Sequence, residues 1–299
     1  MHNLYANFVK ILDVCKKFSA DLVNELGNMP RPGVVPKFSD LEVIALSLTS
    51  ESMEIDSENY LFANLEDYRH MMPNLISRRQ YNDRRKFTSK LCEKIRKRIV
   101  EHIDGGEDVF IIDSKPVQVC KLARGKRNCM GKDAPEMAPD FGYCASQSVY
   151  YFGYKLNAVC GISGVIHSYD LMPASVHDLK YLNDVQQEFF KCVFIGDKGY
   201  LSADIQLNLF ETVQIKLEVP YRLNQKDWKP FPQIYGKVRK RIETNFSQVT
   251  DQFNIMRNYA KQLAGFFTRI ISKISAFTIA QYLNVVNNRP IGWIKYALA

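Results

Sequence analysis

The sequence predicts an α/β protein in which an all-α domain precedes a domain built on a mixed five-stranded sheet. Two observations predict this order. Residues 1–104 carry helix-capping signatures and apolar residues at helical spacing, with no convincing strand pattern. From residue 105 onward, three apolar strand-like runs come first, and then helix, strand, helix, strand and helix follow. We therefore place a domain boundary between residues 104 and 105.

The elements of the second domain are recognised as short apolar runs with turn residues between them. Tyr150–Val159 and Gly164–Leu171 are joined by Gly-Ile-Ser-Gly and are expected to form a hairpin. The other strands are expected at Val109–Ile112, Val193–Ile195 and Val213–Val219, and helices at 175–190, 202–210, 235–253 and 259–287. The apolar seam of the last helix could support self-association, although such a seam more often packs on its own domain.

The first domain is expected to contain a strongly basic helix. Ser77-Arg78-Arg79-Gln80 has the pattern of a capping box and opens a helix to about Ile99, and Ser39-Asp40-Leu41-Glu42 opens an earlier one. Between Ser77 and Arg98, ten basic residues outnumber two acidic ones. A turn followed by such a helix indicates a helix-turn-helix, although a basic face can equally be only solvated. The DNA contacts predicted here are Arg78, Arg79, Arg84, Arg85 and Lys86.

Composition favours a polyanionic partner and argues against several classes of protein. Lys and Arg number 40 against 32 Asp and Glu, for a net charge of +8. The seven cysteines are an odd number without CxxC spacing, which argues against a disulfide framework and a structural zinc site. Charged and polar residues interrupt the apolar runs near the start of the chain and at 270–286. We therefore expect a cytoplasmic protein without a membrane partner.

Two apolar strands end in an aspartate. Asp113 follows Val-Phe-Ile-Ile, and Asp197 follows Val-Phe-Ile-Gly. Ligands bind at the carboxyl ends of strands in open α/β sheets, so we expect both carboxylates at one sheet edge. Like charges this close are costly unless a cation neutralises them, and hard oxygen ligands suit Mg²⁺ or Mn²⁺. The alternative is that either aspartate is an ordinary turn former.

A third acid, Glu243, lies on the long helix at 235–253, next to the apolar stripe that contains Ile242 and Phe246. From this position it could lean over the sheet edge. Three such carboxylates can hold two metal ions, which activate an attacking oxygen and stabilise the leaving oxygen of a phosphodiester. The alternative is an exposed residue paired with Arg239 four positions earlier. The order strand, strand and helix makes the three acids together more specific than any one alone.

These segments resemble the bacterial insertion-sequence transposases with a DDE catalytic domain, which are relatives of the retroviral integrases and share the RNase H-like fold. The resemblance covers residues 105–255 well, and its most specific motif is the Gly-Asp-Lys-Gly-Tyr block at 196–200. The segments that carry it are Ile112–Val117, Phe152–Leu156, Pro173–Asp178, Gly196–Tyr200 and Arg239–Glu243.

The last helix departs from a Tyr, Arg, Glu and Lys series that some relatives carry. Arg239 stands four residues before Glu243, as the series requires. Gly236 occupies the tyrosine position, however, and Thr250 occupies the lysine position. The subgroup, and with it the handling of flanking DNA, is therefore left open.

The resemblance implies a transposase that binds the terminal inverted repeats of an insertion sequence, cuts DNA strands and joins the freed 3′-hydroxyl to target DNA. In that scheme Asp113 and Asp197 would bridge two Mg²⁺ (or Mn²⁺) ions, and Glu243 would complete the site of one. The protein would act as a homodimer or larger assembly on double-stranded DNA, in the bacterial cytoplasm at the nucleoid. An RNase H-like nuclease without joining activity and a non-catalytic DNA-binding regulator are the alternatives.

Further DNA contacts are expected around the three acids. The connection at 121–148 is long and basic, and we interpret it as a loop that reaches nucleic acid. A lysine directly after an active-site aspartate is well placed to contact phosphate. The contacts predicted in this domain are Lys126, Arg127, Lys155, Lys198 and Arg239.

His177 has two possible roles. It could be a catalytic or DNA-contacting residue near the acids. The favoured interpretation is that Ser175 and Asp178 cap a helix and that His177 is a residue of its first turn.

Overall fold

The computed structural model describes residues 3–222, 224 and 228–298, and the chain divides into two compact units. The first unit comprises Met1–Ile103 and Gln248–Ala299, and the second comprises Asp104–Ser247. The boundary expected at residues 104 and 105 thus lies within one residue of the observed one. The C-terminal segment, which we expected in the catalytic domain, groups with the N-terminal helices instead. This second boundary was not predicted.

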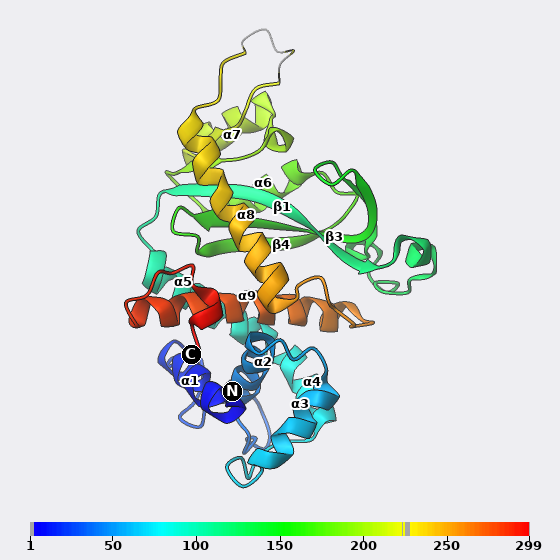
Figure 1. The fold of residues 1–299 in the computed structure, drawn as a ribbon, viewed down its shortest axis with the longest axis vertical. Coiled ribbons are helices and arrows are strands. Elements are labelled where there is room, and N and C mark those ends of the chain that lie inside the picture. The colour runs from blue at the N-terminus through cyan, green and yellow to red at the C-terminus, as the bar shows by residue number, and fades with distance from the viewer. Residues whose placement is uncertain (1–2, 223, 225–227, 299) are drawn as a thin grey trace. The chain divides into compact units, whose positions relative to one another are not determined.

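The first unit is helical throughout the part that the structure describes, apart from turns and loops (Figure 1). Its helices are α1 (Leu4–Lys17), α2 (Asp40–Ser52), α3 (Glu58–Leu65), α4 (Arg78–Phe87), α5 (Ser89–Asp104) and α9 (Leu263–Val286). Both predicted capping boxes are confirmed. The backbone N–H of Ser39 donates to the Glu42 side chain at 2.6 Å, and that of Ser77 donates to the Gln80 side chain at 3.0 Å.

The basic helix expected from Ser77 to about Ile99 is two helices. α4 ends at Phe87, and α5 begins at Ser89. The buried residue between them, Thr88, caps α4 with its backbone N–H and also donates its hydroxyl to the Arg85 carbonyl at 3.3 Å. A side chain that bonds the backbone in this way competes with the regular helix, which explains the break.

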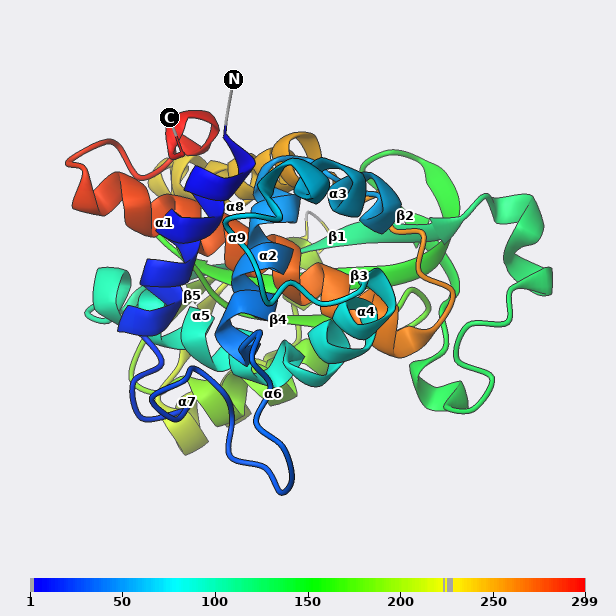
Figure 2. The ribbon, with the colours of Figure 1, turned by 90° about the horizontal axis from the view of Figure 1, so that it is seen from below.

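Helix α9 packs against α2 within the first unit (Figure 2). Lys273 Nζ donates to Glu51 Oε2 at 2.6 Å, and each of these side chains is 1% exposed. The hydroxyls of Ser47 and Ser272 form a second buried bridge at 3.0 Å. A buried charge requires its partner, so this pairing explains why the C-terminal segment belongs with the N-terminal helices.

Among the described residues, α9 alone is long and apolar enough to cross a membrane, judged by length and composition. Within its most apolar window, 72% of the residues are buried in the protein. The core helix of a soluble protein has the same properties. The apolar seam expected at 259–287 therefore packs inside its own unit.

The second unit is built on a mixed sheet, in which the described residues form six strands. The strands are β1 (Val109–Cys120), β2 (Asp140–Cys144), β3 (Val149–Gly161), β4 (Ile166–Pro173), β5 (Val193–Ile195) and β6 (Lys216–Glu218). The helices are α6 (Leu182–Glu188), α7 (Ala203–Val213) and α8 (Gln233–Phe253), and the part of α8 from Gln248 onward is grouped with the first unit. The strand order is β2–β3–β1–β5–β6, and β4 also pairs with β3. β3 is antiparallel to β1, β2 and β4, whereas β5 is parallel to both β1 and β6. The five predicted strands are all present.

The prediction of five strands is wrong by one, because β2 lies in the connection at 121–148 that we expected to be a loop. Gly142 of β2 lies so close to Ala174 that an added Cβ would come within 2.7 Å of the Ala174 Cβ. The rings of Tyr143 and Tyr150 meet across β2 and β3 with centroids 4.8 Å apart. Cross-strand pairing of this kind stabilises a strand that has few apolar residues of its own.

Helices cover both faces of the sheet (Figure 1). α6 and α7 pack on the face that carries Ile112 and Phe194. α8 lies on the opposite face, where Asn245 Nδ2 donates to the Gly164 carbonyl at 2.9 Å. Successive side chains of a strand point to opposite faces. Asp113, directly after Ile112, therefore points to the face that α8 covers.

Replacing Lys273 by Met is expected to destabilise the helical unit, because Glu51 then loses its closest cation while staying buried. Breaking a buried ion pair in this way typically costs about 3–5 kcal/mol. The midpoint of urea unfolding measures the change. The double variant Lys273→Met, Glu51→Leu should recover most of the loss, since Arg85, the other cation near Glu51, still has Glu58 at 3.5 Å. An unfolding midpoint equal to that of the exposed control Lys295→Met would contradict the role of the pair.

Candidate active site

Asp113 and Asp197 lie on one face of two neighbouring parallel strands. β1 and β5 pair in parallel, with Ile111 opposite Ile195. Continuing this register by two residues brings Asp113 opposite Asp197, with both side chains on the face covered by α8. The side chains are 21% and 49% exposed, respectively, so both carboxylates reach solvent. The two acids thus lie on the same face, but Asp113 does not end its strand as the sequence predicted, because β1 continues to Cys120 and pairs Asp113 with Ala158.

Arg239 of α8 supplies the positive charge between them. Its Nη2 lies 3.8 Å from Asp113 Oδ2 and 3.9 Å from Asp197 Oδ2. Its Nε is buried and has no hydrogen-bond partner within the part of the chain that the structure describes. We expected Arg239 to contact DNA; in the structure it is the counter-charge of the two aspartates.

The two aspartates are held in the same way. The backbone N–H of Ser114 donates to Asp113 Oδ1 at 2.8 Å, and that of Gly199 donates to Asp197 Oδ1 at 2.7 Å. In both residues Oδ1 is thus bound to the backbone, and Oδ2 faces Arg239. Asp197 also caps the short helix Lys198–Tyr200, so the turn-former alternative and the site interpretation are both compatible with its geometry.

Burial raises the pKa of the Asp113 carboxyl from its usual 3.8 to about 6. The negative charges of Asp197 and Glu243 raise it further, whereas the Ser114 N–H and Arg239 lower it. Desolvation therefore outweighs the neighbouring guanidinium. The ionised form of Asp113 is therefore less favourable than that of an exposed aspartate.

Glu243 lies one turn after Arg239 on α8, and its side chain is exposed. Its charge acts on Asp113, so it belongs to the same neighbourhood. Within the described ranges, however, no three His, Cys, Asp or Glu side chains are grouped so as to hold a metal ion. The structure thus brings Asp113 and Asp197 together and leaves Glu243 near them but outside the cluster.

The Gly-Asp-Lys-Gly-Tyr block folds as a strand end followed by a tight turn. Gly196 donates its N–H to the Glu218 carbonyl at 2.9 Å, which extends the pairing of β5 with β6. An added Cβ at Gly196 would lie 3.2 Å from Ile112 Cγ2 and 3.3 Å from Tyr200 Cδ2. A small residue is therefore favoured immediately before Asp197, since a larger one would displace these neighbours.

The predicted DNA contacts of the second unit differ in their availability. Lys198 is exposed directly after Asp197, and Lys126 and Arg127 are exposed on the short helix Leu122–Arg127. Lys155, in contrast, is 16% exposed and lies 3.0 Å from Asp178. Lys155 is thus already paired within the protein.

Several predicted contacts of the first unit are paired inside it, so the basic face is smaller than the sequence suggests. Arg84 is 2.7 Å from the buried Asp40, and Arg85 is 5% exposed between Glu51 and Glu58. Arg78 is 3.6 Å from Glu58, and Lys86 is 3.4 Å from Asp83. The remaining one, Arg79, is exposed. Acids from distant parts of the sequence hold Arg85 in the interior, so its predicted contact with DNA would need a path through the fold.

His177 itself caps the helical turn that follows it. Its Nδ1 accepts a hydrogen bond from the Leu179 N–H at 3.2 Å, and the turn begins at Asp178. The cap expected from Ser175 is therefore two residues too early. Asp178, which sequence analysis assigned only to capping, pairs with Lys155. An added Cβ at Gly199 would be 3.6 Å from Asp178 Oδ2 and 3.8 Å from Asp197 Oδ1, so these two acids are near neighbours.

Comparison with known proteins identifies the family of this chain. The sequence model of the family described as "Transposase DDE domain" matches residues 104–279, which include Asp113, Asp197 and Glu243. No curated protein matches the chain. A cryo-EM structure of the piggyBac transposase synaptic complex with hairpin DNA is similar, with a TM-score of 0.51 and 9% identity over 100% of this chain and 79% of that one. At this identity the likeness is one of fold alone.

In the metal-free protein, ionisation of Asp113 is expected to lower stability as the pH rises. The pKa of its carboxyl is higher in the folded chain, at about 6, than its usual value of 3.8, so the folded state binds this proton more tightly. The stabilising contribution is therefore complete below about pH 4 and lost by about pH 6–7. Asp113→Asn removes the titrating group, so its stability relative to the wild type should rise by about 1–3 kcal/mol over this range. Urea unfolding in EDTA at a series of pH values measures the difference.

The matched control is Asp133→Asn, which removes an exposed carboxylate from the same unit. A stability difference for Asp113→Asn that does not change with pH would contradict the raised pKa, and so would an equal trend in the control.

Proposed function

This chain belongs to the transposase DDE-domain family, and on that premise we propose that it binds the terminal inverted repeats of an insertion sequence and catalyses DNA cleavage and strand transfer. The matched region covers more than half of the chain and contains all three predicted acids. The similar solved structure is of a transposase with hairpin DNA, and we extend a double-stranded DNA partner to this chain as part of the proposal.

The observation that carries the proposal is the placement of Asp113 and Asp197 on one face of neighbouring parallel strands. Two adjacent carboxylates would repel the phosphates of bound DNA, which is unfavourable for a protein that only binds. Their presence is explained if they recruit cations to the phosphodiester. For this reason an enzyme is favoured over a DNA-binding regulator.

We infer that Mg²⁺ or Mn²⁺, two ions per site, is held by Asp113 and Asp197, with Glu243 as the third ligand. The donor set fits such ions, because carboxylate oxygens are hard ligands and Oδ2 of each aspartate already faces a cationic group. The raised pKa of Asp113 also fits, since a cation would stabilise its ionised form. When bound, the ions supply activation of the attacking oxygen and stabilisation of the leaving oxygen.

The chain's own basic groups would position the DNA. Lys198 is exposed next to Asp197 and can bind a phosphate at the site. Arg239 would be free to turn its planar guanidinium to a phosphate once the two aspartates are neutralised. Lys126 and Arg127, exposed on their short helix, add contacts further along the backbone. The reaction is then promoted by position and charge, with no covalent intermediate on the enzyme.

We also propose that the second unit is RNase H-like. Without β2, the strand order is β4–β3–β1–β5–β6, a five-stranded mixed sheet in which β3 is antiparallel to its neighbours. Asp113 stands on the central strand β1, and Asp197 follows β5. In this view β2 is an addition beside β4 on the edge of β3.

We further propose that the protein acts as a homodimer or larger assembly on DNA, in the bacterial cytoplasm at the nucleoid. An element has two ends, and two copies of the protein would provide one active site for the strand transfer of each end. The seam of α9 is internal, so the association surface would lie elsewhere. The composition, with a net charge of +8, supports residence on DNA.

Asp197→Asn is expected to abolish cleavage of labelled element ends in Mg²⁺ or Mn²⁺ while DNA binding is kept or tightened. Loss of several kcal/mol of charge stabilisation corresponds to a rate at least about a thousandfold lower. Removing a negative charge near phosphate should not weaken binding. Gel-resolved cleavage and joining products, with DNA affinity measured in parallel, test both parts.

The exposed Asp204→Asn, on α7 at the other sheet face, is the control and should cleave normally. Wild-type-like cleavage by Asp197→Asn would exclude the metal site. Cleavage without joining by the wild type would favour the nuclease, and binding without cleavage would favour the regulator.

A further inference from the structure

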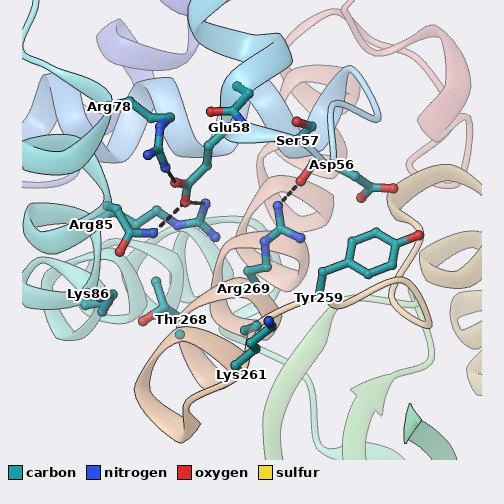
Figure 3. A pocket seen from close by; sticks show the side chains of 14 residues that line it. Asp56, Ser57, Glu58, Arg78, Arg85, Lys86, Tyr259, Lys261, Thr268 and Arg269 are labelled. Atoms are coloured by element: carbon teal, nitrogen blue, oxygen red, sulfur yellow. Dashed lines mark hydrogen bonds and ion pairs between the residues drawn. The ribbon is translucent and has the colours of Figure 1, made fainter.

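A charged cavity of about 690 Å³ lies within the helical unit, and none of the residues that line it was considered for catalysis. It is bounded by the start of α3, one side of α4, the segment before α9 and the first turns of α9 (Figure 3). Five cationic side chains line it against two carboxylates. The cations are Arg78, Arg85, Lys86, Lys261 and Arg269, and the acids are Asp56 and Glu58.

The two acids are engaged with protein groups. Glu58 accepts a hydrogen bond from Asn82 at 2.8 Å and pairs with Arg78 and Arg85 at 3.6 and 3.5 Å (Figure 3). Asp56 is 3.7 Å from Lys273, a cation outside the cavity lining. Lys86 is 3.4 Å from Asp83, so the positive charge that remains for a ligand comes from Lys261 and Arg269.

Arg269 is the buried donor of this site. Its side chain is 8% exposed, and Nη2 donates to the Asp56 carbonyl (Figure 3). For the other guanidinium nitrogens, the described part of the chain offers no acceptor. A guanidinium that is nearly buried, lines a cavity and keeps unused donors requires an acceptor from outside the protein or from water.

The rim adds groups that suit a phosphate. Lys261 is exposed and forms no ion pair with any described residue, and Tyr259, which also lines the cavity, is 72% exposed. Helix α9 begins directly after them without a side-chain cap at Gln262, and Gly265 of its first turn lines the cavity. The uncapped N–H groups of a helix start attract anions, which reinforces the charge of the side chains.

We propose that this cavity binds the phosphodiester backbone of double-stranded DNA, as a contact separate from the carboxylate site. The inference rests on the proposed function for the identity of the ligand, because a phosphate of DNA is the anion such a protein meets. Arg, Lys and Tyr side chains together with a helix N-terminus are the groups that proteins use to fix the DNA backbone. A free phosphorylated small molecule offers the same chemistry and is separated from DNA by the test.

Lys261→Ala and Tyr259→Phe test the proposal, with Lys295→Ala and Tyr296→Phe as controls matched in residue type and exposure. Fluorescence anisotropy of a labelled element-end duplex, without metal and at several salt concentrations, gives the affinity and its salt dependence. Lys261→Ala should weaken binding about three- to tenfold and reduce the salt slope by about one. Tyr259→Phe should weaken binding by about twofold or more without changing the slope, since no charge is lost. The controls should match the wild type.

Equal affinity and slope for Lys261→Ala and Lys295→Ala would overturn the proposal. A thermal shift by inorganic phosphate that depends on Lys261, with unchanged affinity for the duplex, would also overturn it in favour of a small phosphorylated ligand. The proposed function fails separately: a wild type that binds DNA through Lys261 but does not cleave it keeps the cavity contact and loses the enzyme. If the wild type cleaves DNA and Lys261→Ala does not change DNA binding, the proposed function stands and the cavity contact is overturned.

Discussion

The cost of placing two carboxylates, one of them largely desolvated, on one face of adjacent parallel strands is the constraint on which the rest of the site depends. The sheet register fixes Asp113 and Asp197 on one face, and burial makes the charge on Asp113 costly. Arg239 of α8 partly offsets that cost with its positive charge. α8 is itself anchored to the sheet by the hydrogen bond from Asn245 to the Gly164 carbonyl. Sheet, helix and hairpin turn are thus linked by the need to balance negative charge at one point.

In the helical unit, several of the basic side chains are paired with carboxylates inside the fold. Glu51 lies between Lys273 and Arg85, and Arg85 lies between Glu51 and Glu58, so one buried network joins α2, α4 and α9. Such a network depends on all its members, because each one left alone would be a buried charge. The charge that can reach a polyanion is therefore concentrated at exposed positions such as Lys261 and Lys198.

Local patterns in the sequence were sufficient for the capping boxes and the five predicted strands, since each depends on neighbours in the chain. The proximity of Asp113 and Asp197 was inferred from their positions after two apolar runs. Features that depend on distant residues could not be predicted. The break at Thr88, the interior position of Arg85 and the grouping of α9 with α2 all arise from contacts across the fold. β2 was missed because its cross-strand partners stabilise it more than its own composition does.

The shared hydrogen-bonding pattern of the two aspartates has a consequence for metal selectivity. Oδ1 accepts a backbone N–H in both Asp113 and Asp197, so Oδ2 is the less engaged oxygen of each carboxylate and monodentate binding of a proposed metal ion would be favoured. Ca²⁺ takes six to eight oxygens and often grips a carboxylate through both, whereas Mg²⁺ accepts single oxygens and retains several waters. In the proposed metal site, the backbone N–H groups of Ser114 and Gly199 would thereby favour Mg²⁺ over Ca²⁺ by coordination number.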